Sequence, residues 1–302
     1  MSVDSKQSAA APKATAKASD WFTIPAPLRR LFKHFPLLVY PANELPFRTL
    51  PNRELPTLYV FSTDQDALQG LPSFNPSCLK WQTFLKLAGA EFRIIPSTNH
   101  ASPNGALPFL IRPSSASDAD SQTPVPSNKL EKYARGNGST QVPEVSSLRL
   151  EAYQSLLDHR IRNAWLYSLY LNPKDTALLF DLYINPTSST QVVRNTIWHQ
   201  LQHAAESEIL KSTGAPAVNP PALYKGAEEA FEALATVLGG EAWFFGNLNP
   251  GLFDATVFAY THLVLDEKLS WQDSRLRDAL MNYPSLVEHR DRILARYWGL
   301  QG

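Results

Sequence analysis

The chain has very little cysteine, no excess charge of either sign and no long hydrophobic run. One cysteine in 302 residues excludes an internal disulfide and a zinc site built from several cysteines, so the chain does not need an oxidising compartment. Its 28 Lys and Arg balance 28 Asp and Glu, which argues against binding to nucleic acid through bulk charge. Because its longest apolar stretches fall short of the ~20 residues that span a bilayer, we expect no transmembrane helix.

The motifs of the common enzyme classes are also missing. The sequence contains no phosphate-binding P-loop, no G-x-G-x-x-G, no G-x-S-x-G and no paired-carboxylate signature. His199, His203 and Glu206 have the helical spacing of metal ligands, but a polar stripe on a helix explains them as well. We therefore expect no catalytic residue, no cofactor and no metal ion.

The N-terminal region differs from the remainder in composition and charge. Residues 1–20, rich in Ala, Ser and Lys, are typical of a disordered tail without a secretory signal or a presequence, and residues 21–56 form a basic and aromatic arm. Residues 1–53 hold eight Lys and Arg against three Asp and Glu, whereas the rest holds 20 against 25. The arm either packs on its own domain or docks on a partner protein or membrane surface. The residues expected to bind are Trp21, Phe22, Leu28, Arg29, Arg30, Leu31, Phe32 and Phe35.

Residues 57–143 predict an α/β domain with the strand and helix order of thioredoxin. We expect strands over 57–61, 92–95 and 106–111, with Pro108 at the start of the third strand in a cis peptide. Asn75 should cap a helix that has proline at its first position and ends at Gly89. Residues 113–126, rich in Ser, Pro and Asp, are expected to form a disordered insertion.

From residue 144 to residue 302 the apolar spacing becomes helical. Helices are expected over 150–171, 191–210, 222–238 and 285–298. Residues 252–265 are almost all apolar, which predicts a helix buried on every side. The predicted fold class is therefore α/β plus all-α: a thioredoxin-like domain followed by an all-helical domain.

Cys78 is the one candidate for a thiol nucleophile, and it lies near a helix start, where the helix dipole lowers a thiolate pKa. In thioredoxin-like domains the reactive residue is the first of a C-P-x-C quartet, which here reads Asn75-Pro76-Ser77-Cys78. Asn thus occupies the attacking position, and Cys78 shares an apolar face with Trp81 and Leu85. A small core residue is the simpler interpretation, with thiol transfer as the alternative.

The order of the two domains resembles the glutathione S-transferase fold, and particular segments resemble the metaxin family within it. Residues 75–89 are similar to the metaxin helix P-x-C-L-K-x-x-T-Y-L-K, and residues 244–258 are similar to its segment F-F-G-x-x-P-x-x-L-D-A-x-V-F. Residues 105–110 resemble the X-cis-Pro strand of the fold. The resemblance covers most of the chain after residue 57, and the arm also looks like that of fungal members.

The resemblance implies roles for residues at two further places. Asp254 would be the third residue of the buried helix and accept a hydrogen bond from the backbone N–H of Gly251, which replaces the usual Ser or Thr. After the fourth strand, transferases use Glu-Ser to hold the γ-glutamyl group of glutathione. This chain has Ser127-Asn128-Lys129 there, so the carboxylate is missing.

What the resemblance implies is a non-enzymatic, peripheral subunit of the sorting and assembly machinery, on the cytosolic face of the mitochondrial outer membrane. The expected partners are the membrane-embedded β-barrel subunit, a second metaxin-like subunit, and β-barrel precursors whose sorting signal the subunit helps to recognise. The lack of a C-terminal anchor favours the unanchored, metaxin-2-like member of fungi. Two alternatives remain open: a glutathione-dependent transferase of an atypical class, and a scaffold that uses the fold only to pair with homologous folds.

Overall fold

The computed structural model of the chain describes residues 54–113, 123–144 and 148–300. The predicted tail and all but the last three residues of the predicted arm lie outside these ranges, together with the eight residues expected to bind a partner. Residues 114–122 of the predicted insertion also lie outside them.

A four-stranded sheet organises the first half of the described chain. Its strands are β1 (Thr57–Val60), β2 (Arg93–Pro96), β3 (Phe109–Ile111) and β4 (Val125–Pro126), in the order β2-β1-β3-β4. β1 pairs in parallel with β2 and antiparallel with β3, and β3 pairs antiparallel with β4. The sheet is accompanied by α2 (Asp64–Leu68), η3 (Asn99–Ala101), η5 (Ser127–Lys129) and α4 (Leu130–Asn137).

The structure corrects two strand boundaries. The predicted insertion 113–126 is wrong at its end, because Val125 is buried and pairs with Leu110 as part of β4. The third strand was expected from residue 106, but β3 begins at Phe109, directly after Pro108, whose missing N–H cannot join a ladder. The peptide between Leu107 and Pro108 is cis, as predicted.

α3 (Pro76–Leu87) lies between the sheet and the helices of the second half. It ends just before Gly89, which has φ +66° and lies so close to Ser139 that a Cβ there would collide with it. Cys78 packs in the core of the sheet, whereas Leu79 belongs to the core of the helical half. The sequence predicted a single apolar face for this helix, and the second buried face arises because α10 packs across it.

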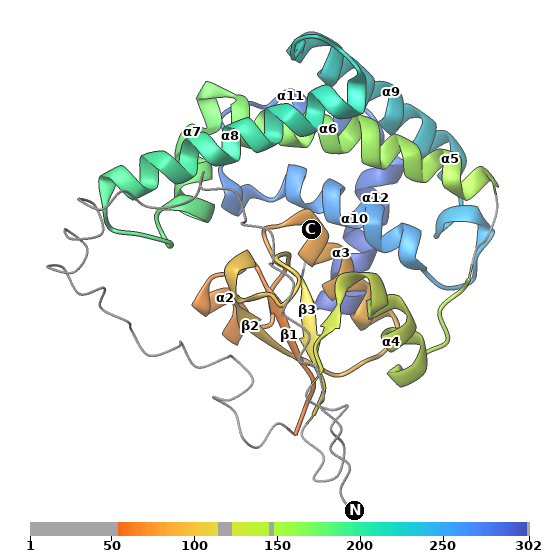
Figure 1. The fold of residues 1–302 in the computed structure, drawn as a ribbon. Helices are drawn as coiled ribbons and strands as arrows, with labels where there is room; N and C mark the ends of the chain where they lie inside the picture. The colour runs from red at the N-terminus through yellow and green to blue at the C-terminus, as the bar shows by residue number, and fades with distance from the viewer. Residues whose placement is uncertain (1–53, 114–122, 145–147, 301–302) are drawn as a thin grey trace, which may run out of the picture. The chain divides into compact units, whose positions relative to one another are not determined.

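The second half is helical throughout. The first four segments follow one another directly along residues 148–171, as predicted (Figure 1). The segments are α5 (Leu148–Leu156), η6 (Leu157–Ile161), α6 (Arg162–Leu166), η7 (Tyr167–Leu171), η8 (Pro173–Asp175), α7 (Thr176–Leu179), η9 (Phe180–Ile184), α8 (Gln191–Thr213), α9 (Pro220–Leu238), η10 (Phe244–Gly246), α10 (Leu252–Leu265), η11 (Glu267–Leu269), α11 (Arg275–Met281), α12 (Pro284–Ile293) and η12 (Leu294–Trp298).

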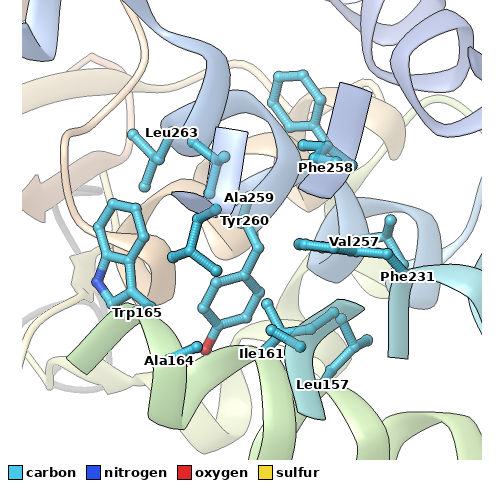
Figure 2. Packing of buried hydrophobic residues seen from close by; sticks show 14 of the residues in the cluster. Leu157, Ile161, Ala164, Trp165, Phe231, Val257, Phe258, Ala259, Tyr260 and Leu263 are labelled. Carbon is cyan, nitrogen blue, oxygen red and sulfur yellow. The ribbon is translucent and has the colours of Figure 1, made fainter. Parts of the chain in front are cut away.

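α10 is the centre of the helical half. Every residue from Phe253 to Val264 is buried, as the nearly continuous apolar sequence predicted. Figure 2 shows Tyr260 of α10 against Ala164, in a group that also holds Ile161 and Trp165. Because a large apolar side chain contributes about 1.5–3 kcal/mol when it is fully buried, this helix anchors the helices packed around it.

Candidate functional site

Asn75, at the position of a thioredoxin-type nucleophile, is held by contacts within the chain. Its side-chain oxygen accepts a hydrogen bond from the backbone N–H of Cys78 at 3.2 Å, the N-cap interaction expected from the sequence. Its side-chain NH₂ donates a second bond, at 3.0 Å, to the hydroxyl of Tyr183 in η9. Both ends of the amide are therefore hydrogen-bonded: the oxygen caps α3, and the NH₂ group joins the start of α3 to the helical half.

Tyr183 packs against three other aromatic rings beside the start of α3. Its ring centroid lies 5.1 Å from that of Phe61, 5.3 Å from that of Phe74 and 5.9 Å from that of Tyr170. Burial raises the pKa of Tyr183 well above its usual value, so its hydroxyl stays protonated. We call these four residues the aromatic cluster.

Cys78 is placed where a thiol cannot readily react. Its side chain is fully buried in the core of the sheet half, and burial raises the pKa of the thiol to about 12. Since the thiolate is the reactive form, the helix dipole does not compensate for the lost hydration at this position. The structure thus places Cys78 as a small core residue.

Two further positions also lack groups that could bind glutathione: one backbone N–H is already hydrogen-bonded, and one carboxylate is missing. The backbone N–H of Leu107, just before Pro108, donates to the side-chain oxygen of Asn99 at 3.0 Å, so it is not available to a peptide ligand. Ser127, Asn128 and Lys129 follow β4 as η5, and they bring no carboxylate to this end of the sheet.

Gly251 and Asp254 meet at the start of α10, as the resemblance implied. One carboxylate oxygen of Asp254 accepts from the backbone N–H of Gly251 at 2.8 Å. The other accepts from the backbone N–H of Phe244 at 3.0 Å and lies 3.0 Å from Nε2 of His289. Asp254 is 1% exposed, so these contacts stabilise the central helix and face no ligand.

A cleft of about 580 Å³ lies beside the aromatic cluster. One wall comes from the chain after β1 and after β2, and the other from η9, the loop that follows it and the first half of α8. α8 runs beside α6 in the helical half (Figure 1). Apolar surface predominates in the lining, and the side chains that supply it include Phe61, Phe74, Leu182, Tyr183, Ile197 and Leu201.

The ionisable residues in the lining of this cleft are the acidic Asp64 and Asp181 and the imidazole of His100. No lysine or arginine accompanies them. The polar lining consists of hydroxyls and amides such as those of Ser62, Thr98 and Gln200. The cleft therefore offers an apolar floor, hydrogen-bonding side chains and a negative field.

This cleft could not be predicted from the sequence. Its walls join residues near 61–100 to residues near 181–201, and nothing in either segment marks it as half of a cavity. Tyr183 does not belong to any sequence motif either. The exposed Val192 and Val193 at the start of α8 were the one available signal, because unpaired apolar residues on a helix end suggest a contact surface.

No metal site forms within the described part of the chain, where no three His, Cys, Asp or Glu side chains gather closely enough to hold an ion. His199, His203 and Glu206 are exposed along α8, as a polar stripe would be. Of the helices over residues 54–113, 123–144 and 148–300, none combines the length and apolar character that a membrane crossing requires.

Two family models match the chain, one in each half. The glutathione S-transferase N-terminal domain matches residues 76–175, and the glutathione S-transferase C-terminal domain matches residues 227–293. Metaxin-1 of Macaca fascicularis is 24% identical, over an alignment that covers 77% of this chain and 73% of that protein. These matches agree with the strand order and the helical second half.

Solved structures of transferases resemble the chain at low identity. A glutathione transferase family member from Pseudomonas fluorescens, solved with two glutathione molecules bound, is 13% identical, with a TM-score of 0.45 and coverage of 88% of this chain and 94% of that one. The β-etherase LigF from Sphingobium is 14% identical, with a TM-score of 0.46 and coverage of 80% and 95% respectively.

Proposed function

Because the chain is a metaxin-like protein with the glutathione S-transferase fold, we propose that it works as a non-enzymatic subunit that binds other proteins. It associates peripherally with the cytosolic face of the mitochondrial outer membrane, as a part of the sorting and assembly machinery. There it binds the β-barrel subunit and a second metaxin-like subunit. It helps to recognise the sorting signal of β-barrel precursors before they enter the membrane.

The observation that carries the proposal is that both ends of the Asn75 side chain are hydrogen-bonded at the start of α3, one to Tyr183 and one to Cys78. A cysteine-type transferase needs an activated group at this helix start, and the chain instead has an amide with both ends hydrogen-bonded. The burial of Cys78 and the absence of a carboxylate after β4 support the same interpretation. The fold then serves as a scaffold for surfaces, since function depends on sites rather than on folds.

The N-terminal arm is the proposed contact to the barrel subunit. The arm contains Arg29, Arg30 and Lys33 among aromatic and aliphatic residues, the composition of a segment that binds a partner or a lipid surface. The full-length chain with Arg29→Glu and Arg30→Glu should lose this contact, whereas Lys13→Glu with Lys17→Glu in the preceding tail should keep it.

The test is a pull-down of the tagged full-length chain from detergent-solubilised mitochondria, run beside a glutathione-affinity column. Co-purification of an outer-membrane β-barrel subunit, with no retention on glutathione, is the expected result. Retention on the column with elution by free glutathione, and no barrel partner, would overturn the proposal in favour of the transferase alternative.

A further inference from the structure

The cleft beside the aromatic cluster has a wall that neither family model covers. That wall runs from Asp181 to Leu201. The matched domains end at residue 175 and resume at residue 227. The cavity is therefore built partly from a segment that lies between the two matched transferase domains.

The floor of the cleft suits large apolar side chains. Ile197 and Leu201 face it from α8, opposite Phe61 and Phe74. Val193 lies one helical turn before Ile197 and is 43% exposed, so the apolar face of α8 continues beyond the cavity. An occupant longer than the cavity can thus remain in contact with apolar surface.

The charges select a cationic occupant. Asp64 and Asp181 have no ion-pair partner among the described residues, and the lining supplies no lysine or arginine. Two carboxylates at the margin of an apolar cavity attract a positive group and repel a negative one. A lysine or arginine next to apolar residues has the complementary charge.

The sheet edges favour insertion into the cleft over the addition of a strand. β2 and β4 are the two edge strands, and each ends in a proline, Pro96 or Pro126, which has no N–H to donate. β4 has only two residues, and α2 packs against β2. Neither edge offers a row of free groups on which an extended peptide could pair.

We propose that this cleft binds an extended segment of a client protein, with aromatic or branched aliphatic side chains on its floor and a lysine or arginine beside Asp64 or Asp181. The inference rests on the proposed function and identifies the place where the chain holds a precursor's signal. Ser62, Thr98 and Gln200 supply side-chain hydrogen bonds to the backbone of such a segment.

The test uses two fluorescent peptides of alternating Phe or Leu and Ser, one ending in Lys and its twin ending in Glu. Anisotropy titrations with the full-length chain should show the Lys peptide bound about tenfold more tightly, since each 1.4 kcal/mol changes affinity tenfold. The chain with Asp64→Asn and Asp181→Asn should bind the two peptides with equal affinity. Equal binding of the two peptides by the native chain, or displacement of the Lys peptide by glutathione, would overturn the inference.

Two variants test the location. Ile197→Asp should abolish binding of the Lys peptide, whereas Leu248→Asp, at a side chain 94% exposed outside the cleft, should leave it unchanged. Gln200→Arg changes an exposed residue of the lining, so it keeps the fold and should reduce the preference for the Lys peptide, because it adds a positive charge to the lining. Unchanged binding in Ile197→Asp and unchanged preference in Gln200→Arg would contradict the assignment.

The pull-down separates failure of this inference from failure of the proposed function. If the native chain co-purifies with the barrel subunit but does not prefer the Lys peptide, the cleft is wrongly assigned and the proposed function stands. If the chain prefers the Lys peptide and Gln200→Arg reduces that preference, but no barrel subunit co-purifies, the cleft binds peptides and the proposed function is wrong.

Discussion

The side-chain amide of Asn75 donates a hydrogen bond to the hydroxyl of Tyr183, 108 residues further along the chain. One residue thereby caps α3 and ties it to the helical half. The same contact occupies the position of the reactive residue in cysteine-type transferases.

Asn75→Ala should lower the free energy of unfolding by about 1–2 kcal/mol, because it removes an N-cap and the bond to Tyr183. Asn75→Asp is the comparison variant, since it keeps the capping oxygen and replaces the amide donor with a carboxylate oxygen. Urea unfolding of both, combined with Tyr183→Phe in a double-mutant cycle, measures the coupling. A coupling energy of zero would show that the contact between the halves contributes nothing.

The Cys78 thiol should react with a thiol reagent at pH 8 only when the chain unfolds, because it is fully buried and its pKa is raised to about 12. The measurement is the labelling rate of the single thiol with and without urea. In the matched control, Cys78→Ala with Ser77→Cys, the thiol moves to an exposed neighbour and should label at once. Rapid labelling of native Cys78 would restore the thiol-transfer alternative.

His262 should make the chain less stable in mild acid. Its ring is 5% exposed and stacks on Phe258, and burial, aided by the charges of Arg290 and Lys268, lowers its pKa to about 3. The unfolded chain therefore binds a proton near pH 6.5 that the folded chain refuses, so stability is complete above that pH and falls as the pH drops toward 3.

Between pH 7 and pH 5 this linkage should cost about 2 kcal/mol of unfolding free energy. His262→Phe removes the titrating group from the same aromatic stack. Between pH 7 and pH 5 the unfolding free energy of this variant should therefore fall by about 2 kcal/mol less than that of the native chain. Urea midpoints at the two pH values test the difference. Parallel pH profiles for the native chain and the variant would contradict the assignment.

Asp254→Ala should be the most damaging exchange at the start of α10. It leaves the buried N–H groups of Gly251 and Phe244 without an acceptor and removes the partner of His289, for which we expect about 3 kcal/mol or more. Asp278→Ala, which removes an exposed carboxylate in the first turn of α11, should cost under about 1 kcal/mol. Thermal unfolding of the two variants provides the comparison, and equal melting temperatures would refute the prediction.

The sequence by itself determined the features whose causes lie within a few residues. Asn75 followed by proline marked the start of α3, and the apolar run 252–265 marked the buried helix. The resemblance of residues 244–258 to the metaxin segment implied the hydrogen bond between Asp254 and Gly251 at the start of that helix. Caps, turns and periodic burial are local, so they can be predicted without knowing the path of the chain.

Only the tertiary structure decided which segments that are distant in sequence contact one another. The contact of Asn75 with Tyr183, the second buried face of α3, the pairing of Val125 with Leu110 and both walls of the cleft each join segments that are distant in sequence. Such contacts depend on how whole helices and strands pack, and a pattern within one segment carries no information about its partner. The sequence thus predicted a fold with its usual reactive residues replaced, and the structure located a cleft that another protein segment can fill.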